Sequence, residues 1–103
     1  MKIKLGVAER MNLVGILPAE GNFATQKVVR DLRDRVGFTQ KELGVIGYKV
    51  EDDRVLWDAE KAKEKEYDFG KYEVEVIVEA LQQFDKDEKL TAQQLPLYEK
   101  FIK

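Results

Sequence analysis

The stretch that decides the fold reads Tyr48-Lys49-Val50-Glu51-Asp52-Asp53-Arg54-Val55-Leu56-Trp57. Apolar and charged side chains alternate before Asp52-Asp53, and Arg54 is followed by three apolar residues, so a two-residue turn at the aspartates predicts two antiparallel strands. In that register Glu51 lies opposite Arg54, so a charge pair helps to fix the alignment of the strands. One face of the hairpin would collect Tyr48, Val50, Val55 and Trp57. We therefore expect a β-hairpin over residues 48–57, with Trp57 largely buried.

The chain after the hairpin contains one more short strand and a segment of mixed signals. Tyr67 and Phe69 would share one face of a third strand near residues 66–69. Residues 71–84 alternate like a strand at first, but apolar residues then recur every three or four positions, which is the period of a helix. The length of this segment favours a helix, and whether it begins as strand or helix stays open from the sequence.

Helical periodicity dominates the rest of the chain. Apolar residues recur at three- and four-residue spacings over residues 7–17 and 25–36, and a final helix is expected over residues 91–103. The apolar stripe of the first helix would comprise Val7, Met11, Val14 and Leu17. Gly15 within that helix suggests close packing against a neighbouring element. Pro96 interrupts the last segment and is expected to bend or restart that helix.

Helix-start signals mark a short third helix and the final one. Thr39 and Glu42 have the spacing of a capping box, in which each side chain bonds the other residue's backbone N–H. Thr91 and Gln94 repeat that spacing near the end of the chain. With Thr25, all three threonines stand at predicted helix starts, which favours a structural role for them over a catalytic one.

Together these elements predict the fold class and the domain organisation. We expect an α+β protein of about five helices packed with a small antiparallel sheet, made of the 48–57 hairpin and the strand near 66–69. The 103 residues suit one domain, residues 1–103, which is large enough to bury a modest core without disulfides.

The side-chain inventory restricts the chemistry. His, Cys and Ser are absent, so nucleophile–imidazole catalysis and Cys or His zinc sites are excluded. No glycine-rich phosphate loop is present, and residues 85–96 lack the ligand pattern of a calcium loop. We therefore expect no catalytic, metal-binding or cofactor-binding residues and no enzyme activity. The lack of cysteine, of an apolar leader and of a membrane span favours a cytoplasmic protein.

One alternative function is nucleic-acid binding by a winged helix. Two helices, a short third helix and a hairpin follow one another in the order of that fold, whose third helix reads DNA and whose hairpin forms the wing. The side chains that would contact DNA are Gln40, Lys41, Lys49 and Arg54. Against this function, the net charge is -2, whereas a polyanion binder normally carries a clear basic excess.

The last helix is a candidate contact surface for another protein. Its apolar residues spread over a wider arc than a terminal helix usually needs for one small core. The candidate partner-binding residues are Leu97, Tyr98, Phe101 and Ile102. Either both sides of the arc dock on the protein's own core, or Leu97 and Phe101 stay exposed and bind a partner protein or a second copy.

Seven stretches, spread over most of the chain, carry a likeness to known proteins. They are Ala8-Glu9-Arg10, Leu17-Pro18-Ala19-Glu20-Gly21-Asn22-Phe23, Arg30-Asp31-Leu32-Arg33, Phe38-Thr39, residues 60–70, Lys89-Leu90-Thr91 and Leu97-Tyr98-Glu99-Lys100-Phe101. In these stretches the chain resembles a loose group of small uncharacterised phage and prophage proteins, for which no activity is established. The resemblance implies a viral origin and action in the host cytoplasm as an adaptor, an assembly factor or an inhibitor. The implied partner is a protein, host-encoded or a second copy, and no membrane or cofactor is expected.

Overall fold

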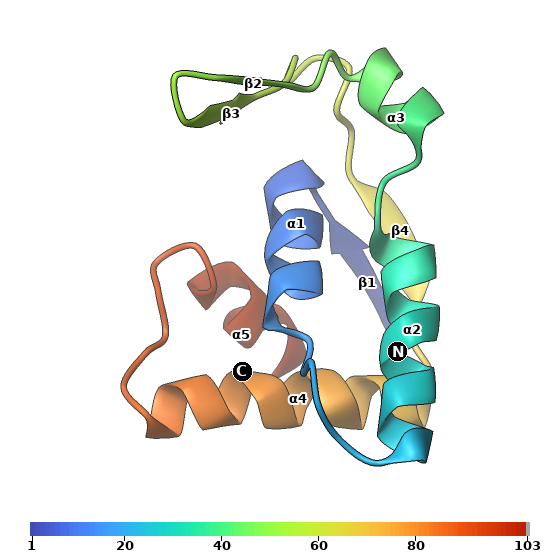
Figure 1. The fold of residues 1–103 in the computed structure, drawn as a ribbon, viewed down its shortest axis with the longest axis vertical. Coiled ribbons are helices and arrows are strands. Elements are labelled where there is room, and N and C mark those ends of the chain that lie inside the picture. Colours follow the sequence, from blue (N-terminus) through green and yellow to red (C-terminus); the bar gives the residue numbers. More distant parts are fainter. Residues whose placement is uncertain (103) are drawn as a thin grey trace.

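The fold is an α+β arrangement of helices around a two-stranded sheet, with a separate hairpin at one end (Figure 1). The computed structural model describes residues 1–102. In chain order the elements are β1 (Lys2–Leu5), α1 (Val7–Ile16), α2 (Phe23–Val36), α3 (Gln40–Val45), β2 (Lys49–Glu51), β3 (Arg54–Leu56), β4 (Lys65–Asp68), α4 (Lys71–Lys86) and α5 (Leu95–Phe101). The expected α+β class is therefore confirmed.

The two-stranded sheet joins the first strand of the chain to a strand far along it. The antiparallel pairs of β1 and β4 are Lys2–Asp68, Ile3–Tyr67, Lys4–Glu66 and Leu5–Lys65. Ile3 and Tyr67 are buried, whereas oppositely charged side chains face each other on the exposed side. The predicted strand near residues 66–69 is thus confirmed, but its partner is β1 rather than the hairpin. β1 was not predicted, because four residues carry too little periodicity to indicate a strand by themselves.

β1 and β4 begin two locally equivalent strand–glycine–helix units. Each unit passes from its strand through a glycine, Gly6 or Gly70, into a helix whose third residue is a glutamate, Glu9 or Glu73. In both units the glutamate side chain accepts a hydrogen bond from the glycine N–H at 2.9 Å. The antiparallel register of the two strands relates these units by a local twofold axis.

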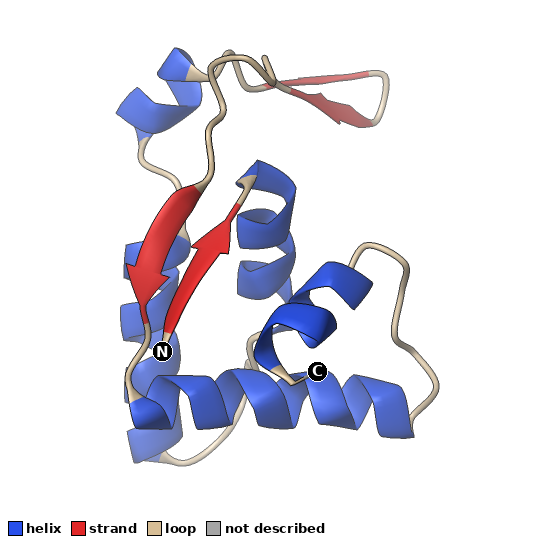
Figure 2. Ribbon diagram, turned by 180° about the vertical axis from the view of Figure 1, so that it is seen from behind, coloured by secondary structure: helices blue, strands red, loops and turns tan. Residues whose placement is uncertain are grey.

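The core lies between the β1–β4 sheet and helices α1, α2, α4 and α5 (Figure 2). Phe69 lies at the centre of the aromatic side chains of the core. Its ring stacks on Tyr67 at a centroid distance of 5.9 Å and packs edge-on against Phe101 at 5.4 Å. The fully buried aliphatic side chains are Leu5, Leu13, Val29, Leu32, Val36, Ile77, Leu81 and Leu97. Neither α3 nor the hairpin strands contribute a buried residue, so these elements lie outside the main core.

The hairpin has the predicted turn and register. Asp52 and Asp53 have φ angles of 51° and 63°, as the two central residues of a type I′ turn require. The observed pairs are Lys49–Leu56, Val50–Val55 and Glu51–Arg54. Most of the Trp57 surface is covered, as expected, although the residue is not fully buried, whereas Val50 is 65% exposed. Val50 is exposed because the hairpin extends away from the helices that form the core (Figure 1).

The predicted stripe of α1 is only partly correct, because Val7 and Leu17 are buried but Met11 and Val14 are not fully buried. The buried residues of α1 are Val7, Arg10, Leu13 and Ile16. Met11 and Val14 are only partly buried, although the pattern assigned them to the core. Gly15 is exposed and open space surrounds the position of a Cβ there, so the expected close packing is absent. The apolar pattern was misleading because one buried position of α1 is an arginine that is held by polar partners.

The other helices begin close to the predicted positions, with two corrections. Residues 71–84 are helical throughout, which decides between the strand and helix alternatives. α2 begins at Phe23, because the Asn22 side chain accepts from the Thr25 N–H at 2.8 Å and is the N-cap in place of Thr25. α5 begins at Leu95 and not at Thr91, because residues 92–94 form a turn. Pro96 lies in the first turn of α5, where its missing N–H removes no helix hydrogen bond, so it neither bends nor restarts the helix.

Candidate functional site

Arg10 is the buried charged side chain of the described residues, at 3% exposure. Its Nε donates to the Val36 carbonyl at 2.9 Å and its Nη2 to the Gly37 carbonyl at 3.0 Å, so the guanidinium caps the end of α2. Both Nη atoms also donate to the Glu42 carboxylate of α3, and Cζ lies 3.9 Å from the centroid of the Phe38 ring. Arg10 thereby fastens α1, α2 and α3 together.

The pKa values of Arg10 and Glu42 follow from this pairing. Burial on its own lowers the pKa of Arg10, but the hydrogen bonds and charge of Glu42 outweigh burial, so the pKa is raised. Hydrogen bonding to Arg10 holds the pKa of Glu42 below its usual value despite partial burial. The expected capping box is only half formed: the Thr39 hydroxyl accepts from the Glu42 N–H, but the Glu42 carboxylate bonds Arg10 instead of Thr39. Because its donors are engaged by protein groups, we interpret this cluster as structural.

Tyr67 lies beside the same cluster, with its ring centroid 5.8 Å from Arg10 Cζ. Burial raises the pKa of its phenol, so the side chain is neutral at ordinary pH. Its hydroxyl is a buried polar atom that makes no hydrogen bond within the described residues. A neutral phenol adds no charge to the cluster, and we assign it to the core.

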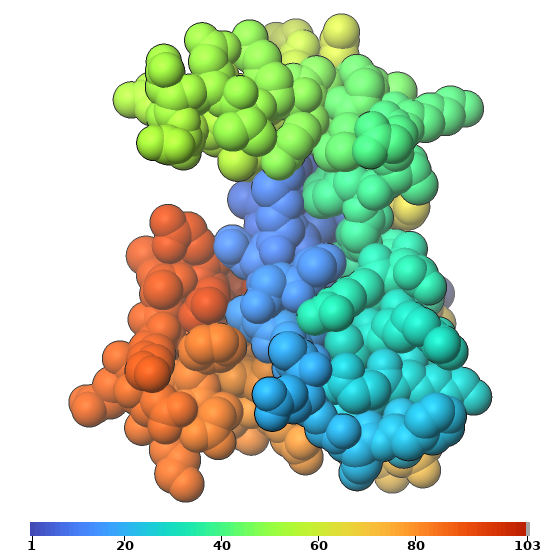
Figure 3. Space-filling model, viewed as in Figure 1, coloured from blue at the N-terminus to red at the C-terminus, as the bar shows by residue number. Residues whose placement is uncertain are grey.

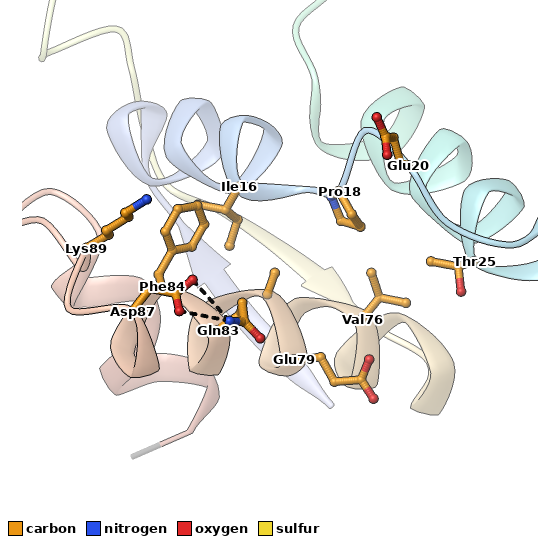
Figure 4. Close-up of a pocket in the computed structure, with 11 residues that line it drawn as sticks. Ile16, Pro18, Glu20, Thr25, Val76, Glu79, Gln83, Phe84, Asp87 and Lys89 are labelled. Atoms are coloured by element: carbon orange, nitrogen blue, oxygen red, sulfur yellow. Dashed lines mark hydrogen bonds between the residues drawn. The ribbon is translucent and has the colours of Figure 1, made fainter.

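A groove runs along α4, between that helix, the end of α1 and the start of α2 (Figure 4). Its main hollow has a volume of about 490 Å³, and a second hollow of about 340 Å³ adjoins the first. The two hollows are continuous because Thr25, Val76 and Glu79 line both of them. We call the two hollows together the α4 groove. Ile16 and Pro18 form part of the opposite wall.

Side chains four residues apart on α4 form two parallel rows in the groove. The apolar row consists of Tyr72, Val76, Ala80 and Phe84. The polar row consists of Glu75, Glu79, Gln83 and Asp87. The four-residue spacing places the members of each row on one side of the helix. Figure 4 shows Gln83 pointing toward Asp87, to which it donates hydrogen bonds of 3.0 and 3.1 Å.

The border of the groove is acidic. Glu20 adds a further carboxylate from the loop before α2, opposite the polar row of α4. Lys89 is the basic residue among those that line the two hollows. Glu75, Glu79 and Glu20 are exposed to solvent, so their charges define the potential that an approaching ligand meets. The groove therefore combines an apolar floor with an excess of negative charge.

Two aromatic side chains near the groove are unusually exposed. Phe23, the first residue of α2, keeps 83% of its surface in solvent, and Tyr72 in the first turn of α4 keeps 71%. Tyr72 lines the groove itself, and Phe23 precedes the groove residue Ala24. Exposed apolar side chains beside a hollow are typical of interaction surfaces. Tyr72 extends the apolar floor of the groove toward solvent, and Phe23 adds an exposed ring at the start of α2.

The α4 groove was not predicted from the sequence. The signal was present in the four-residue repeats of apolar and acidic residues along α4, but the pattern alone assigns the apolar row to the core. Val76, Ala80 and Phe84 are in fact only partly buried, because the loop after α1 and the start of α2 stop short of covering them. The exposure of Phe23 likewise depends on tertiary packing and leaves no trace in the sequence pattern.

The predicted partner-binding residues of α5 lie mainly in the core. Leu97 is 0% exposed and Phe101 is 7% exposed, because α5 packs on α1 and α4 and its Phe101 ring meets Phe69. Tyr98 and Ile102 are partly buried against the same hydrophobic cluster. The structure thus favours the alternative in which both sides of α5 dock on the protein's own core.

The predicted nucleic-acid residues are exposed and lie on three elements, α3 and the two strands of the hairpin. They are Gln40 and Lys41 in the first turn of α3, Lys49 on β2 and Arg54 on β3. Lys49 Nζ lies 3.4 Å from the Glu51 carboxylate, and Glu51 also lies opposite Arg54 in the hairpin. The Glu51 carboxylate therefore lowers the positive potential around Lys49 and Arg54.

Within residues 1–102, no three His, Cys, Asp or Glu side chains gather closely enough to hold a metal ion. None of the helices in that range combines the length and the apolar character needed to cross a membrane. No family model, curated protein or solved structure matches the chain.

Proposed function

We propose that this chain is a non-catalytic protein-binding module that holds a basic, amphipathic helix of another protein in the α4 groove. The observation that carries the proposal is the pair of rows on α4, apolar and acidic, beside the exposed Phe23 and Tyr72. A partner helix with apolar residues at three- and four-residue spacings would fill the floor, as in other helix-in-groove complexes. Its lysines or arginines would face Glu75 and Glu79.

The charge of the groove determines which partner suits it. Carboxylates at the border attract a basic segment and repel an acidic one, which favours specificity and fast association more than raw affinity. The apolar floor and the two aromatics supply the area that must be removed from water for stable binding. Nucleic acid is a poor occupant of this groove because its phosphates would meet the same carboxylates.

The resemblance to small phage and prophage proteins supports a biological setting for this binding. We propose that the chain acts in the host cytoplasm as an adaptor, an assembly factor or an inhibitor, and that its partner is encoded by the host. Binding alone would suffice for each of these roles, since occupying a helix of a host protein alters that protein's assembly or activity.

A test of the groove uses two synthetic helical peptides with the same apolar residues, one with lysine and one with glutamate at the polar positions. NMR titration should show amide shifts around Val76, Ala80 and Phe84 with the lysine peptide and none with the glutamate peptide. Glu79→Lys should weaken binding of the lysine peptide by roughly tenfold, since one attraction becomes a repulsion. Glu60 is an exposed carboxylate outside the groove, so the control variant Glu60→Lys should leave binding of the lysine peptide unchanged. Equal binding of both peptides, or shifts away from α4, would refute the proposal.

Winged-helix DNA binding is the second candidate. Its support is the order of α1, α2, α3 and the β2–β3 hairpin, together with the exposure of Lys41 and Arg54. Duplex DNA titrated at low and physiological salt tests it, because phosphate contacts make binding strongly salt-dependent. If this function holds, Lys41→Glu combined with Arg54→Glu should abolish the binding. We expect no complex at physiological salt.

A further inference from the structure

The β2–β3 hairpin presents an open strand edge at the end of the molecule opposite α4. In the described residues its strands pair only with each other, and no third strand covers either edge. Figure 3 shows open space between the hairpin and the C-terminal part of the chain. A two-stranded hairpin is marginally stable by itself and gains from added strands with an apolar face. The hairpin is therefore a candidate for pairing with another strand.

The turn geometry determines which backbone groups point outward from β2. In a hairpin with a two-residue I′ turn, the residues that flank the turn, Glu51 and Arg54, form a hydrogen-bonded pair. The next pair, Val50–Val55, is then a non-hydrogen-bonded pair. The N–H and C=O of Val50 therefore point away from β3, toward the open edge of β2. Those of Val55 point toward the open edge of β3.

The sequence of β2 is complementary to itself in the antiparallel direction. If two copies meet with a twofold axis at Val50, the two Val50 residues exchange both of their N–H···O=C bonds. The same register places Lys49 of each copy opposite Glu51 of the other, so two opposite-charge pairs form across the axis. β3 lacks this property, because the equivalent register would place Arg54 opposite Leu56.

We propose that β2 pairs with β2 of a second copy of this chain, so that the two hairpins form one four-stranded antiparallel sheet. The pairing would gather Val50 and Val55 of both copies on one face, where they are now 65% and 42% exposed. Partly buried Tyr48 and Trp57 flank that face. The sheet would therefore gain cross-strand hydrogen bonds, two charge pairs and apolar contact at once. This inference is independent of the α4 groove, which lies on other elements.

Sedimentation equilibrium over a wide concentration range tests the pairing. The wild type should show a mass that rises with concentration from monomer toward dimer. Val50→Pro removes the N–H at the proposed axis and should leave a monomer. Val55→Pro removes the Val55 N–H, which faces solvent on the open edge of β3. This control variant should still dimerise. Proline is tolerated at such edge positions because the N–H is not used within the hairpin.

A charge-exchange experiment tests the register. Lys49→Glu and Glu51→Lys should each weaken self-association by roughly tenfold, because two attractive pairs become repulsive. An equimolar mixture of the two variants should associate again, since the strand with two glutamates then pairs with the strand that carries two lysines. Lys41→Glu on α3, the same charge change outside the strand, should dimerise like the wild type. A cross-strand NOE between residues 50 and 55 verifies that the hairpin is intact in each variant.

Three results would overturn the proposal. The first is a wild type that stays monomeric up to millimolar concentration. The second is Val50→Pro that self-associates as well as Val55→Pro does. The third is a mixture of Lys49→Glu and Glu51→Lys that associates no better than either variant alone. If one of the charge variants loses its hairpin, the comparison of Val50→Pro with Val55→Pro still decides the outcome.

Discussion

Glu9 and Glu73 make the same set of contacts on opposite sides of the local twofold axis. Each accepts a hydrogen bond from the glycine N–H before its helix and pairs with a cation from another helix, Lys100 or Arg35. Each cation also donates to a carbonyl of the strand that precedes the glycine, at 2.6 Å for Lys100 and 2.7 Å for Arg35. α5 and α2 are thereby tied to the two strand–glycine–helix units by equivalent contacts.

Glu42→Gln should lower stability in a pH-dependent way. The pKa of Glu42 in the folded chain is held below its ordinary value of 4.5 by Arg10, so its ionised form stabilises the fold. The stabilisation by ionised Glu42 is complete at pH values above the pKa of Glu42 in the unfolded chain. It is lost as the pH falls through the lower pKa of Glu42 in the folded chain. We expect a loss of about 2 kcal/mol at neutral pH, typical of hydrogen bonds to a charged group. Urea unfolding at several pH values measures it.

The difference between wild type and Glu42→Gln should shrink toward zero as the pH falls below 4.5, where Glu42 is increasingly protonated in both states. A difference that is independent of pH would show that the carboxylate charge does not stabilise the fold. Glu75→Gln, an exposed carboxylate on α4, is the control and should change little at any pH.

Gly15→Ala and Gly37→Ala should act in opposite directions. A Cβ at Gly15 meets open space, so alanine should stabilise α1 by about 0.5 kcal/mol through its helix propensity. A Cβ at Gly37 would stand 2.5 Å from the Arg33 carbonyl oxygen, so the backbone there would have to shift. That shift would disturb the Gly37 carbonyl, which accepts from Arg10, so alanine should lower the free energy of unfolding by about 2 kcal/mol. Urea midpoints at constant slope measure both. Equal effects would contradict the described packing of the two positions.

Leu97→Ala should destabilise the monomer by about 3 kcal/mol, because Leu97 is completely buried in the core. Leu95→Ala on the same helix removes a side chain that is 48% exposed, so it should change stability by less than about 1 kcal/mol. Phe101→Ala should resemble Leu97→Ala. A monomer that tolerates both Leu97→Ala and Phe101→Ala would show that α5 is a contact surface and not part of the core.

Asp53→Gly should stabilise the hairpin. Asp53 adopts a φ of 63°, which glycine adopts without steric cost, and Asp-Gly is a preferred sequence for this turn. Hydrogen exchange of hairpin amides should slow by roughly fivefold, which corresponds to about 1 kcal/mol. Exchange in α4 should stay as in the wild type, because the hairpin lies outside the main core. Faster exchange in the hairpin would contradict the assigned turn.

Local patterns predicted much of the fold correctly. The register of the hairpin followed from a two-residue turn at the two aspartates, and the helix at residues 71–84 followed from its period and length. Thr39 was correctly identified as a cap, since the hydroxyl of a threonine at such a position has an orphan N–H within reach. These features depend on neighbours in the sequence, which is why they were predictable.

Features that depend on distant contacts were not predictable in this way. β1 forms because β4 lies beside it, and the burial of Arg10 depends on carbonyls of α2 and a carboxylate of α3. Nothing in the pattern of α1 distinguishes Arg10 from a solvent-exposed arginine. The exposure of Phe23 and the α4 groove likewise arise from how α1, α2 and α4 meet.

The pairing of β1 with β4 also governs when this region can fold during synthesis. Ile3 leaves the ribosome long before its partner Tyr67 and before the ring of Phe101 that completes the aromatic cluster. Until those residues emerge, the apolar side chains of β1 and α1 that face β4, α4 and α5 stay uncovered. The core can therefore close only when α5 has left the ribosome.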